Sequence, residues 1–240
     1  MNIKNTFPGI LTDLIYPRRC PVCDRAVSPF GRLVCETCKE AFEYVKEPYC
    51  MKCGKKLEDA QTEYCSDCMR RRHLFDRGRA LCSYRSISDS IYRFKYKGRR
   101  EYAAYYAVCM DRGLGNWIRQ CRPDALVPVP IHASKRRVRG YNQAEALAKE
   151  LGSRTGIPVE ADLVRRVRKT VPMKELSLDE RQNNLKRAFK ICRNDVKLNT
   201  IIIIDDIYTT GSTIDAMSYE LRRAGVKRIY FVTLAIGNGL

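Results

Sequence analysis

One stretch near the carboxyl end of the sequence, Thr200 to Thr213, constrains the fold more than any other. Four consecutive isoleucines are followed by Asp205 and Asp206, then by Ile-Tyr-Thr-Thr-Gly-Ser-Thr. A short β-branched apolar run is typical of a strand buried on both faces, as in a parallel sheet. Residues 214–224, with apolar side chains at helical spacing and Gly225 as a stop, predict a helix. The stretch therefore predicts a strand, a turn and a helix.

The turn between this strand and this helix has the residues of a phosphate site. Free backbone N–H groups and the macrodipole favour an anion at a helix N-terminus, and the turn adds hydroxyl side chains and Gly211. Asp205 and Asp206, at the carboxyl end of the strand, can accept hydrogen bonds from sugar hydroxyls or hold Mg²⁺. The alternative is an ordinary buried strand whose acids cap the next helix.

This order of residues resembles the phosphoribosyl-pyrophosphate (PRPP) motif of type I phosphoribosyltransferases. The resemblance implies that PRPP binds together with Mg²⁺ and that Asp205 and Asp206 are the catalytic acids. The PRPP-binding residues that it implies are Thr209, Thr210, Gly211, Ser212 and Thr213. Tyr208 departs from the motif, which usually has an aliphatic residue at that position.

Eight of the twelve cysteines form four CxxC pairs that recur every fifteen residues. Two thiolates of one pair can bind one metal ion, and two pairs complete the tetrahedral set that zinc prefers. Four thiolates leave no open position, so two structural zinc ions are predicted. Disulfides are the alternative, which a reducing compartment disfavours. The eight predicted ligands are Cys20, Cys23, Cys35, Cys38, Cys50, Cys53, Cys65 and Cys68.

The spacing leaves two pairing schemes open. Sequential pairing gives two zinc ribbons, over residues 20–38 and 50–68, whereas alternate pairing gives a cross-braced module. We expect sequential pairing because each half contains a hairpin-sized loop. The remaining cysteines are expected to be buried apolar thiols; these are Cys82, Cys109, Cys121 and Cys192.

Positive charge is concentrated in the middle of the sequence. Residues 76–200 contain 28 Lys and Arg against 13 Asp and Glu, in a chain of net charge +18. Such a field suggests an anionic partner, for which a polyphosphate and a nucleic acid both fit, or else a solubilising surface. The absence of a transmembrane-length apolar run and of a signal-peptide pattern favours the cytoplasm. An amphipathic helix is expected over residues 7–15. We expect it to pack on its own protein; the alternatives are a partner protein or the inner face of the membrane.

Strand and helix patterns alternate from about Arg79 onward, which indicates an α/β domain. Strands are expected at residues 80–84, 124–132 and 226–236, and helices at residues 89–97, 101–120 and 144–154. In FKYKGRR, aromatic and basic residues interleave. This composition can stack nucleic-acid bases and contact phosphates, or it can belong to a helix that buries Phe94 and exposes its lysines. A proline-stiffened loop is expected after the second strand, with His132 as a loop residue and its basic residues facing a second phosphate.

Three longer segments extend the resemblance. FKYKGRREYA, VPVPIHASKRRVRGYNQAEALAKEL and RVRKTVPMKELSLDERQNNLKRAF follow the CxxC pairs and precede the acidic turn, in an order that resembles the ComF family of competence-associated phosphoribosyltransferase-like proteins. The resemblance implies an N-terminal helix and double zinc ribbon over residues 1–75. It implies a type I phosphoribosyltransferase-like α/β domain, with a parallel sheet flanked by helices, over residues 76–240. A hood over the site is implied for residues 165–194; the alternative for this basic segment is a solvated surface flap.

The resemblance implies a reaction in which PRPP loses pyrophosphate at C1 and an acceptor nitrogen takes its place. Lys135, Arg136 and Arg139 are then the pyrophosphate-binding residues. No residue specifies the acceptor. The alternative function, implied by the same family, is a non-catalytic module that senses PRPP and binds single-stranded DNA among the proteins of DNA uptake in natural competence.

Overall fold

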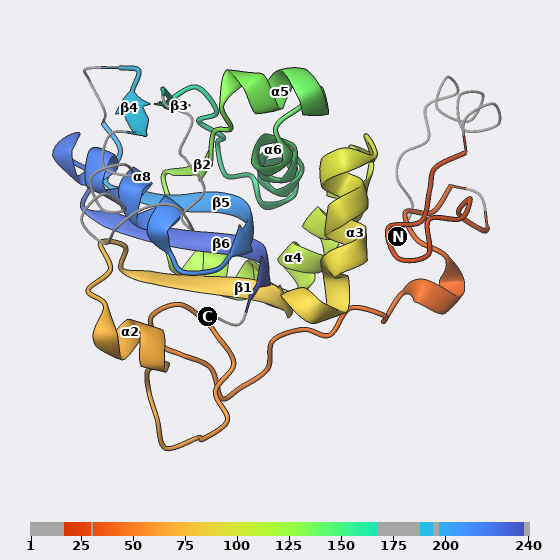
Figure 1. The fold of residues 1–240 in the computed structure, drawn as a ribbon, viewed down its shortest axis with the longest axis horizontal. Coiled ribbons are helices and arrows are strands. Elements are labelled where there is room, and N and C mark those ends of the chain that lie inside the picture. The colour runs from red at the N-terminus through yellow and green to blue at the C-terminus, as the bar shows by residue number, and fades with distance from the viewer. Residues whose placement is uncertain (1–16, 30, 168–187, 194–196, 238–240) are drawn as a thin grey trace.

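The computed structural model describes residues 17–29, 31–167, 188–193 and 197–237. Its centre is a parallel sheet in the order β1-β6-β5-β2 (Figure 1). The strands are β1 (Arg77–Ser83), β2 (Ala125–Pro128), β5 (Thr200–Tyr208) and β6 (Arg228–Ile236). The predicted helix over residues 7–15 lies outside the described residues. The parallel α/β fold is confirmed.

The isoleucine run lies in β5, which pairs with β2 on one side and β6 on the other. Successive side chains of a strand point to opposite faces, and all four isoleucines are fully buried. Ile201 and Ile203 pack in the core beneath α8, whereas Ile202 and Ile204 pack in the core beneath α4 and α6. An interior strand covered on both faces therefore explains the unbroken apolar run.

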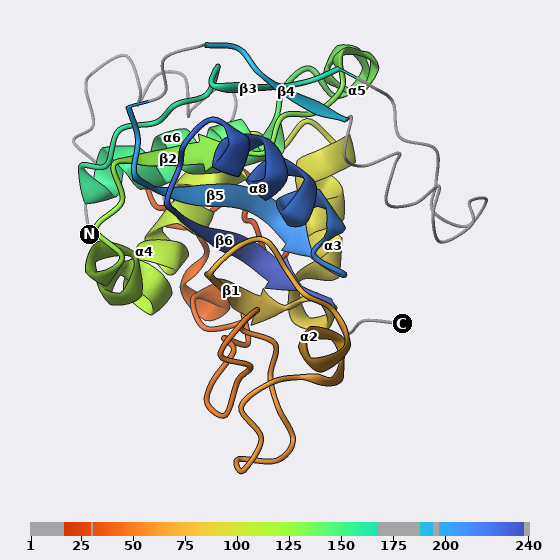
Figure 2. The same cartoon turned by 90° about the vertical axis from the view of Figure 1, so that its left-hand side faces the viewer.

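Helices cover both faces of the sheet (Figures 1 and 2). α8 (Ser212–Arg223) lies on one face, and α4 (Tyr102–Gln120) and α6 (Gln143–Thr155) lie on the other. α3 (Tyr84–Tyr96) leaves the carboxyl end of β1 and is separated from α4 at Gly98, as predicted. Among the described residues, none of these helices is both long and apolar enough to cross a membrane.

The segment after β2 corrects one prediction. The expected loop around Lys135 is a short helix, α5 (Ala133–Arg139), that ends at Gly140 with φ of 78°. His132 is its N-cap, since its Nδ1 accepts a hydrogen bond from the Ser134 backbone N–H at 3.2 Å. Lysine and arginine are good helix formers, so this basic run becomes helical once an N-cap and a C-cap are supplied.

Two short strands lie at the flanks of the predicted hood. β3 (Val164–Arg166) pairs antiparallel with β4 (Phe189–Ile191). Residues 168–187, most of the predicted hood, lie outside the described residues.

The cysteine-rich segment forms two lobes, which contain the 3₁₀ helix η1 (Glu36–Cys38) and α2 (Ser66–Arg70). Figure 1 shows the first beside α3 and the second below β1. Cys20 and Cys38 belong to the core of α3 and α4, whereas Cys50, Cys53 and Cys65 belong to the core beneath α8. The division into residues 1–75 and 76–240 stays a prediction.

The remaining cysteines follow the prediction with two exceptions. Cys82 and Cys109 are buried, as expected. Cys121 is half-buried, and Cys192 is exposed just after the short strand β4.

Candidate functional site

The predicted phosphate turn joins the carboxyl end of β5 to the N-terminus of α8. β5 ends at Tyr208 and α8 begins at Ser212. Gly211 is the N-cap, and its φ of 79° lies in the left-handed region that favours glycine. The hydroxyls of Thr210 and Ser212 are hydrogen bonded at 2.9 Å. The turn has the geometry of an anion site, because the first N–H groups of a helix have no intrahelical partner.

The two acids lie among the last four residues of β5, just before this loop, and Asp206 is close to a lysine. The Asp206 carboxylate is 2.9 Å from Lys95 Nζ, and both side chains are largely buried. Asp205 Oδ1 accepts a hydrogen bond from the Asp206 backbone N–H at 2.8 Å. Desolvation, and then the charge of Asp206, raise the pKa of Asp205 to about 8. At neutral pH the pair therefore holds a proton, which a bound cation would displace.

Lys135 of α5 is close enough to Asp206 for the two charges to interact. Burial and the charges of Arg166 and Arg139 lower the pKa of its ammonium group. Lys95 lowers this pKa further, whereas Asp206 raises it. Four cationic side chains thus act on one another around a pair of carboxylates. A phosphate group would relieve their mutual repulsion.

The other two predicted pyrophosphate residues have partners within the protein. Arg139 donates to the Tyr96 hydroxyl at 3.2 Å, and its guanidinium lies over the Tyr96 ring, 4.9 Å from the centroid. Arg136 is largely exposed and lies 3.6 Å from the Glu145 carboxylate of α6. The structure brings Arg139 next to α3 and turns Arg136 toward α6.

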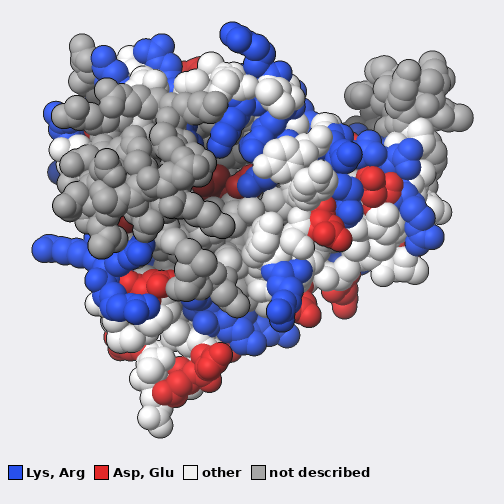
Figure 3. Space-filling view, viewed as in Figure 1, with Lys and Arg blue, Asp and Glu red and all other residues white. Residues whose placement is uncertain are grey.

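Figure 3 shows a hollow in this face of the molecule, beside the end of β5. Acidic atoms lie at its floor, and lysine and arginine atoms gather along its edge over α5. Carboxylates below and cationic groups above suit a phosphorylated ligand that binds with a divalent cation.

Two cations beside the acids are not among the predicted site residues. Lys95 follows Phe94, whose full burial supports the plainer interpretation of FKYKGRR as part of an amphipathic helix. Arg166 of β3 lowers the pKa of Asp205 by its charge. No spacing rule relates residue 95 to residue 206. They meet because α3 starts at the carboxyl end of β1 and its last turn, which contains Lys95, reaches the carboxyl end of β5.

The eight predicted zinc ligands form two groups of four, and the sequential pairing is confirmed. Within each group the sulfur atoms all lie within 4.8 Å of one another. A tetrahedral zinc ion with Zn–S bonds of about 2.3 Å places its sulfur ligands about 3.8 Å apart. The structure has 4.0 Å between Cys23 and Cys35 and 3.7 Å between Cys53 and Cys65. Each group fits one structural zinc ion.

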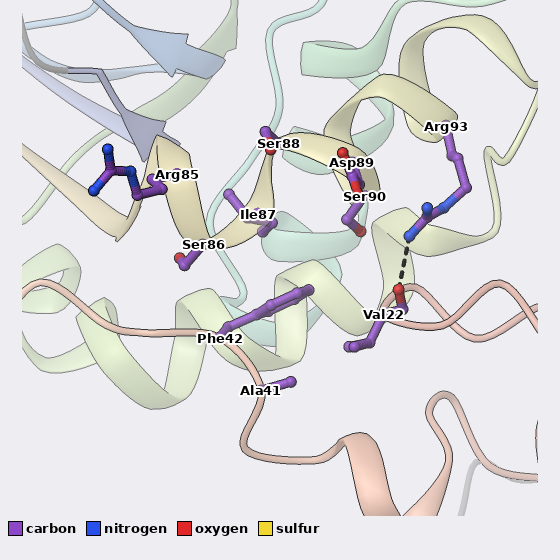
Figure 4. Close-up of a pocket in the computed structure, with 10 residues that line it drawn as sticks. All are labelled: Val22, Ala41, Phe42, Arg85, Ser86, Ile87, Ser88, Asp89, Ser90 and Arg93. Carbon is purple, nitrogen blue, oxygen red and sulfur yellow. Dashed lines mark hydrogen bonds between the residues drawn. The ribbon is translucent and has the colours of Figure 1, made fainter.

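The first zinc group supports α3, the helix that contains Lys95. Figure 4 shows Arg93 reaching from α3 to the Val22 carbonyl, to which its Nη2 donates at 2.7 Å. At the start of α4, the Tyr102 hydroxyl donates to the Asp24 carboxylate at 2.6 Å. Val22 and Asp24 flank the ligand Cys23, so this CxxC turn is attached directly to α3 and α4.

Comparison with known proteins gives matches to both parts of the chain. The double zinc ribbon domain family matches residues 11–69, and the phosphoribosyl transferase domain family matches residues 138–239. Competence protein F of Haemophilus influenzae is 37% identical over 115 residues, which cover 47% of this chain and 50% of that protein. The DNA utilization protein YhgH of Salmonella typhimurium is 30% identical over 150 residues, 60% of this chain and 64% of that protein.

The matched segments thus span half of the first relative and 64% of the second. A solved purine phosphoribosyltransferase from Pyrococcus horikoshii aligns with 55% of this chain and 73% of its own, at 17% identity and a TM-score of 0.36. That score is too low to weigh in the assignment. The double zinc ribbon followed by a phosphoribosyl transferase domain, together with the similarity to competence protein F, shows that the chain belongs to the ComF family.

Proposed function

We propose that the chain binds PRPP with Mg²⁺ in the hollow at the end of β5 and transfers the phosphoribosyl group to an acceptor nitrogen. The observation behind this proposal is the acid pair Asp205 and Asp206, next to a turn capped by Gly211, with Lys95 paired to Asp206 and Lys135 within range of its charge. The turn suits the 5′-phosphate, the acids suit the ribose hydroxyls and the cation, and the basic residues suit the pyrophosphate.

The charges of the site match those that develop in this reaction. When the C1–O bond breaks, its electron pair leaves with pyrophosphate and the ribose becomes cationic. Asp205 and Asp206 would stabilise the cationic ribose, and Lys135 and Arg139 would neutralise the leaving pyrophosphate. The acceptor nitrogen then forms a bond to C1 and loses a proton to solvent.

Binding would exchange ionic partners. Lys95 pairs with Oδ2 of Asp206 at 2.9 Å, so a ribose hydroxyl or a cation that takes this oxygen displaces the lysine. A phosphate oxygen of the same ligand offers the displaced ammonium a new partner. Lys95 would therefore pair with the protein before PRPP binds and with PRPP afterwards.

Calorimetry with PRPP and Mg²⁺ tests the binding proposal. Wild type is expected to give heat of binding, and Asp205→Asn/Asp206→Asn is expected to lose it. No heat with the wild type would remove the PRPP assignment. Release of pyrophosphate on addition of candidate amines and bases then separates an enzyme from a PRPP sensor.

A second proposed function is a role in DNA uptake, with contact to single-stranded DNA. The concentration of Lys and Arg in residues 76–200 favours it, as do the names competence protein F and DNA utilization protein of the two relatives. We propose that this role is carried out in the cytoplasm, with the inner face of the membrane as the alternative location. Affinity for a single-stranded oligonucleotide should fall steeply between about 50 and 200 mM salt; binding that is absent or indifferent to salt would refute this function.

A further inference from the structure

The segment that leaves the second zinc ribbon is bound to the first turn of α8. His73 Nδ1 and Asp215 Oδ2 are hydrogen bonded at 2.7 Å, and the Leu74 backbone N–H donates to Asp215 Oδ1 at 2.8 Å. The His73 side chain is 1% exposed. Asp215 is in the first turn of α8, just beyond the phosphate turn, so residues 73–74 fix the position of that helix end.

The phosphate turn itself rests on His73 and Tyr208. A Cβ atom added to Gly211 would lie 2.6 Å from the Tyr208 hydroxyl oxygen and 2.9 Å from His73 Cε1. Both distances are shorter than normal van der Waals contacts. The backbone of Gly211 is therefore packed directly against these two side chains, which form the floor of the turn.

This floor continues to the second ribbon through Phe75. The Phe75 ring stacks on His73, with centroids 4.7 Å apart, and meets Tyr208 edge-on at 6.2 Å. Lys52 donates from Nζ to the Phe75 carbonyl at 2.5 Å, and its ammonium lies 5.2 Å from the centroid of the Phe75 ring. Because Lys52 lies between the zinc ligands Cys50 and Cys53, a metal-binding turn is linked to the phosphate turn by side chains in contact.

We propose that His73 and Tyr208 are positioning residues that couple the second zinc ribbon to the phosphate turn, so that zinc in this ribbon and an anion on the turn strengthen each other's binding. The inference rests on the proposed function, because the anion is the 5′-phosphate of PRPP. Zinc fixes the turn from Cys50 to Cys53. Without it, Lys52 and Phe75 lose their fixed positions and Gly211 loses its floor. Linkage requires the effect to be reciprocal.

The first test measures zinc release from the full-length, zinc-loaded protein to a chromophoric chelator, with and without PRPP and Mg²⁺. Alkylation of the freed thiols and peptide mass spectrometry assign each release phase to a ribbon. PRPP is expected to slow release from the second ribbon by about fivefold or more, the usual scale of coupling between sites. His73→Leu should abolish this effect, and the exposed neighbour Arg72→Leu should behave as wild type. His73→Asn should keep only part of it, because it retains a donor to Asp215 but loses the ring that stacks on Phe75 and packs against Gly211.

The second test needs no ligand. Hydrogen exchange of the peptide that contains residues 209–212 should be fastest in His73→Leu, intermediate in His73→Asn and slowest in wild type. If PRPP binds but leaves release from the second ribbon unchanged, the coupling is wrong and the proposed function survives. If PRPP does not bind, the proposed function fails, and unchanged exchange in His73→Leu then overturns the coupling separately.

Discussion

Asp205 makes the affinity for PRPP and Mg²⁺ depend on pH. Desolvation and the charge of Asp206 raise its pKa to about 8, and a divalent cation binds the ionised carboxylate. Binding below pH 8 must therefore release a proton, and the affinity should rise from pH 6 to pH 8 by up to about tenfold per pH unit. Calorimetry in buffers of different ionisation enthalpy counts the protons released. A wild-type affinity that is flat over this range contradicts the prediction.

The same carboxyl group affects stability with the opposite sign. An ordinary Asp has a pKa of about 3.9, so between about pH 4 and pH 8 the folded protein keeps a proton that the unfolded chain has lost. The stability contributed by neutral Asp205 is complete below this range and is lost as pH rises through it. Urea unfolding at pH 5 and pH 8 should show wild type losing more stability than Asp205→Asn. Equal losses of unfolding free energy in wild type and Asp205→Asn between pH 5 and pH 8 would show that Asp205 is ionised in the folded state at both pH values.

Lys95 is predicted to be required for PRPP binding. Lys95→Met removes the ammonium group that lies 2.9 Å from Asp206 in the free protein and that would pair with a phosphate oxygen of bound PRPP. The affinity for PRPP should fall about tenfold or more, because a hydrogen bond to a charged group of the ligand is lost. Lys97→Met is the matched control, because Lys97 is exposed near the same helix end. Equal affinities in the two variants would exclude a direct role for Lys95.

At the scale of elements, the turn between β5 and α8 requires glycine for two separate reasons. Gly211 has φ of 79°, and an added Cβ would meet the Tyr208 hydroxyl oxygen at 2.6 Å. Gly225 also has positive φ, 96°, but has open space around it. Gly225→Ala should cost about 1–2 kcal/mol from the backbone alone. Gly211→Ala should cost more in urea unfolding, and Tyr208→Phe should recover part of the difference by removing the oxygen.

The outcome of this comparison separates the two reasons. If both glycine substitutions cost the same, the contact with Tyr208 is soft and only backbone strain matters. If Tyr208→Phe recovers stability in the Gly211→Ala background but not in the Gly225→Ala background, the phosphate turn is packed on that hydroxyl.

The elements that could be predicted from the sequence are those with a local pattern. The strand β5, the turn at Gly211 and the helix α8 follow one another along the chain, so periodicity and glycine chemistry are sufficient to find them. In each half of the cysteine-rich segment, two CxxC pairs separated by a hairpin-sized loop likewise indicate which four cysteines share a zinc ion. The helix α5 was not predictable in this way, because its basic residues have no apolar face and depend on His132 and Gly140 for their ends.

The parts of the site that could not be predicted are contacts between distant elements. Lys95 reaches Asp206, and His73 reaches Asp215, across more than one hundred residues of sequence. The first contact depends on which elements meet at one edge of the sheet, and the second depends on where the second ribbon packs. Neither arrangement can be inferred from the spacing of residues along the sequence. Tyr208 was visible as a departure from the motif, but its role needs the neighbouring Phe75 ring.

At the scale of the whole molecule, the two ribbons belong to the two cores of the α/β domain. Cys20 and Cys38 pack with α3 and α4, and Cys50 and Cys53 pack with the sheet beneath α8. Zinc binding supplies folding free energy, about 10–16 kcal/mol for an isolated structural site. Metal analysis should therefore find two zinc ions per chain, and the exposed Cys192→Ser variant should keep both.

Removal of the zinc ions tests whether the two ribbons and the α/β domain unfold as one cooperative unit. Because each core contains thiol ligands, chelation is expected to lower the melting temperature of the whole protein in one calorimetric transition, and not to unfold a separate ribbon module while the sheet stays intact. Far-ultraviolet circular dichroism should follow the same curve, since most helices belong to these cores. A helical signal that melts at the same temperature with and without zinc would mean that the sheet and its helices fold independently of both ribbons.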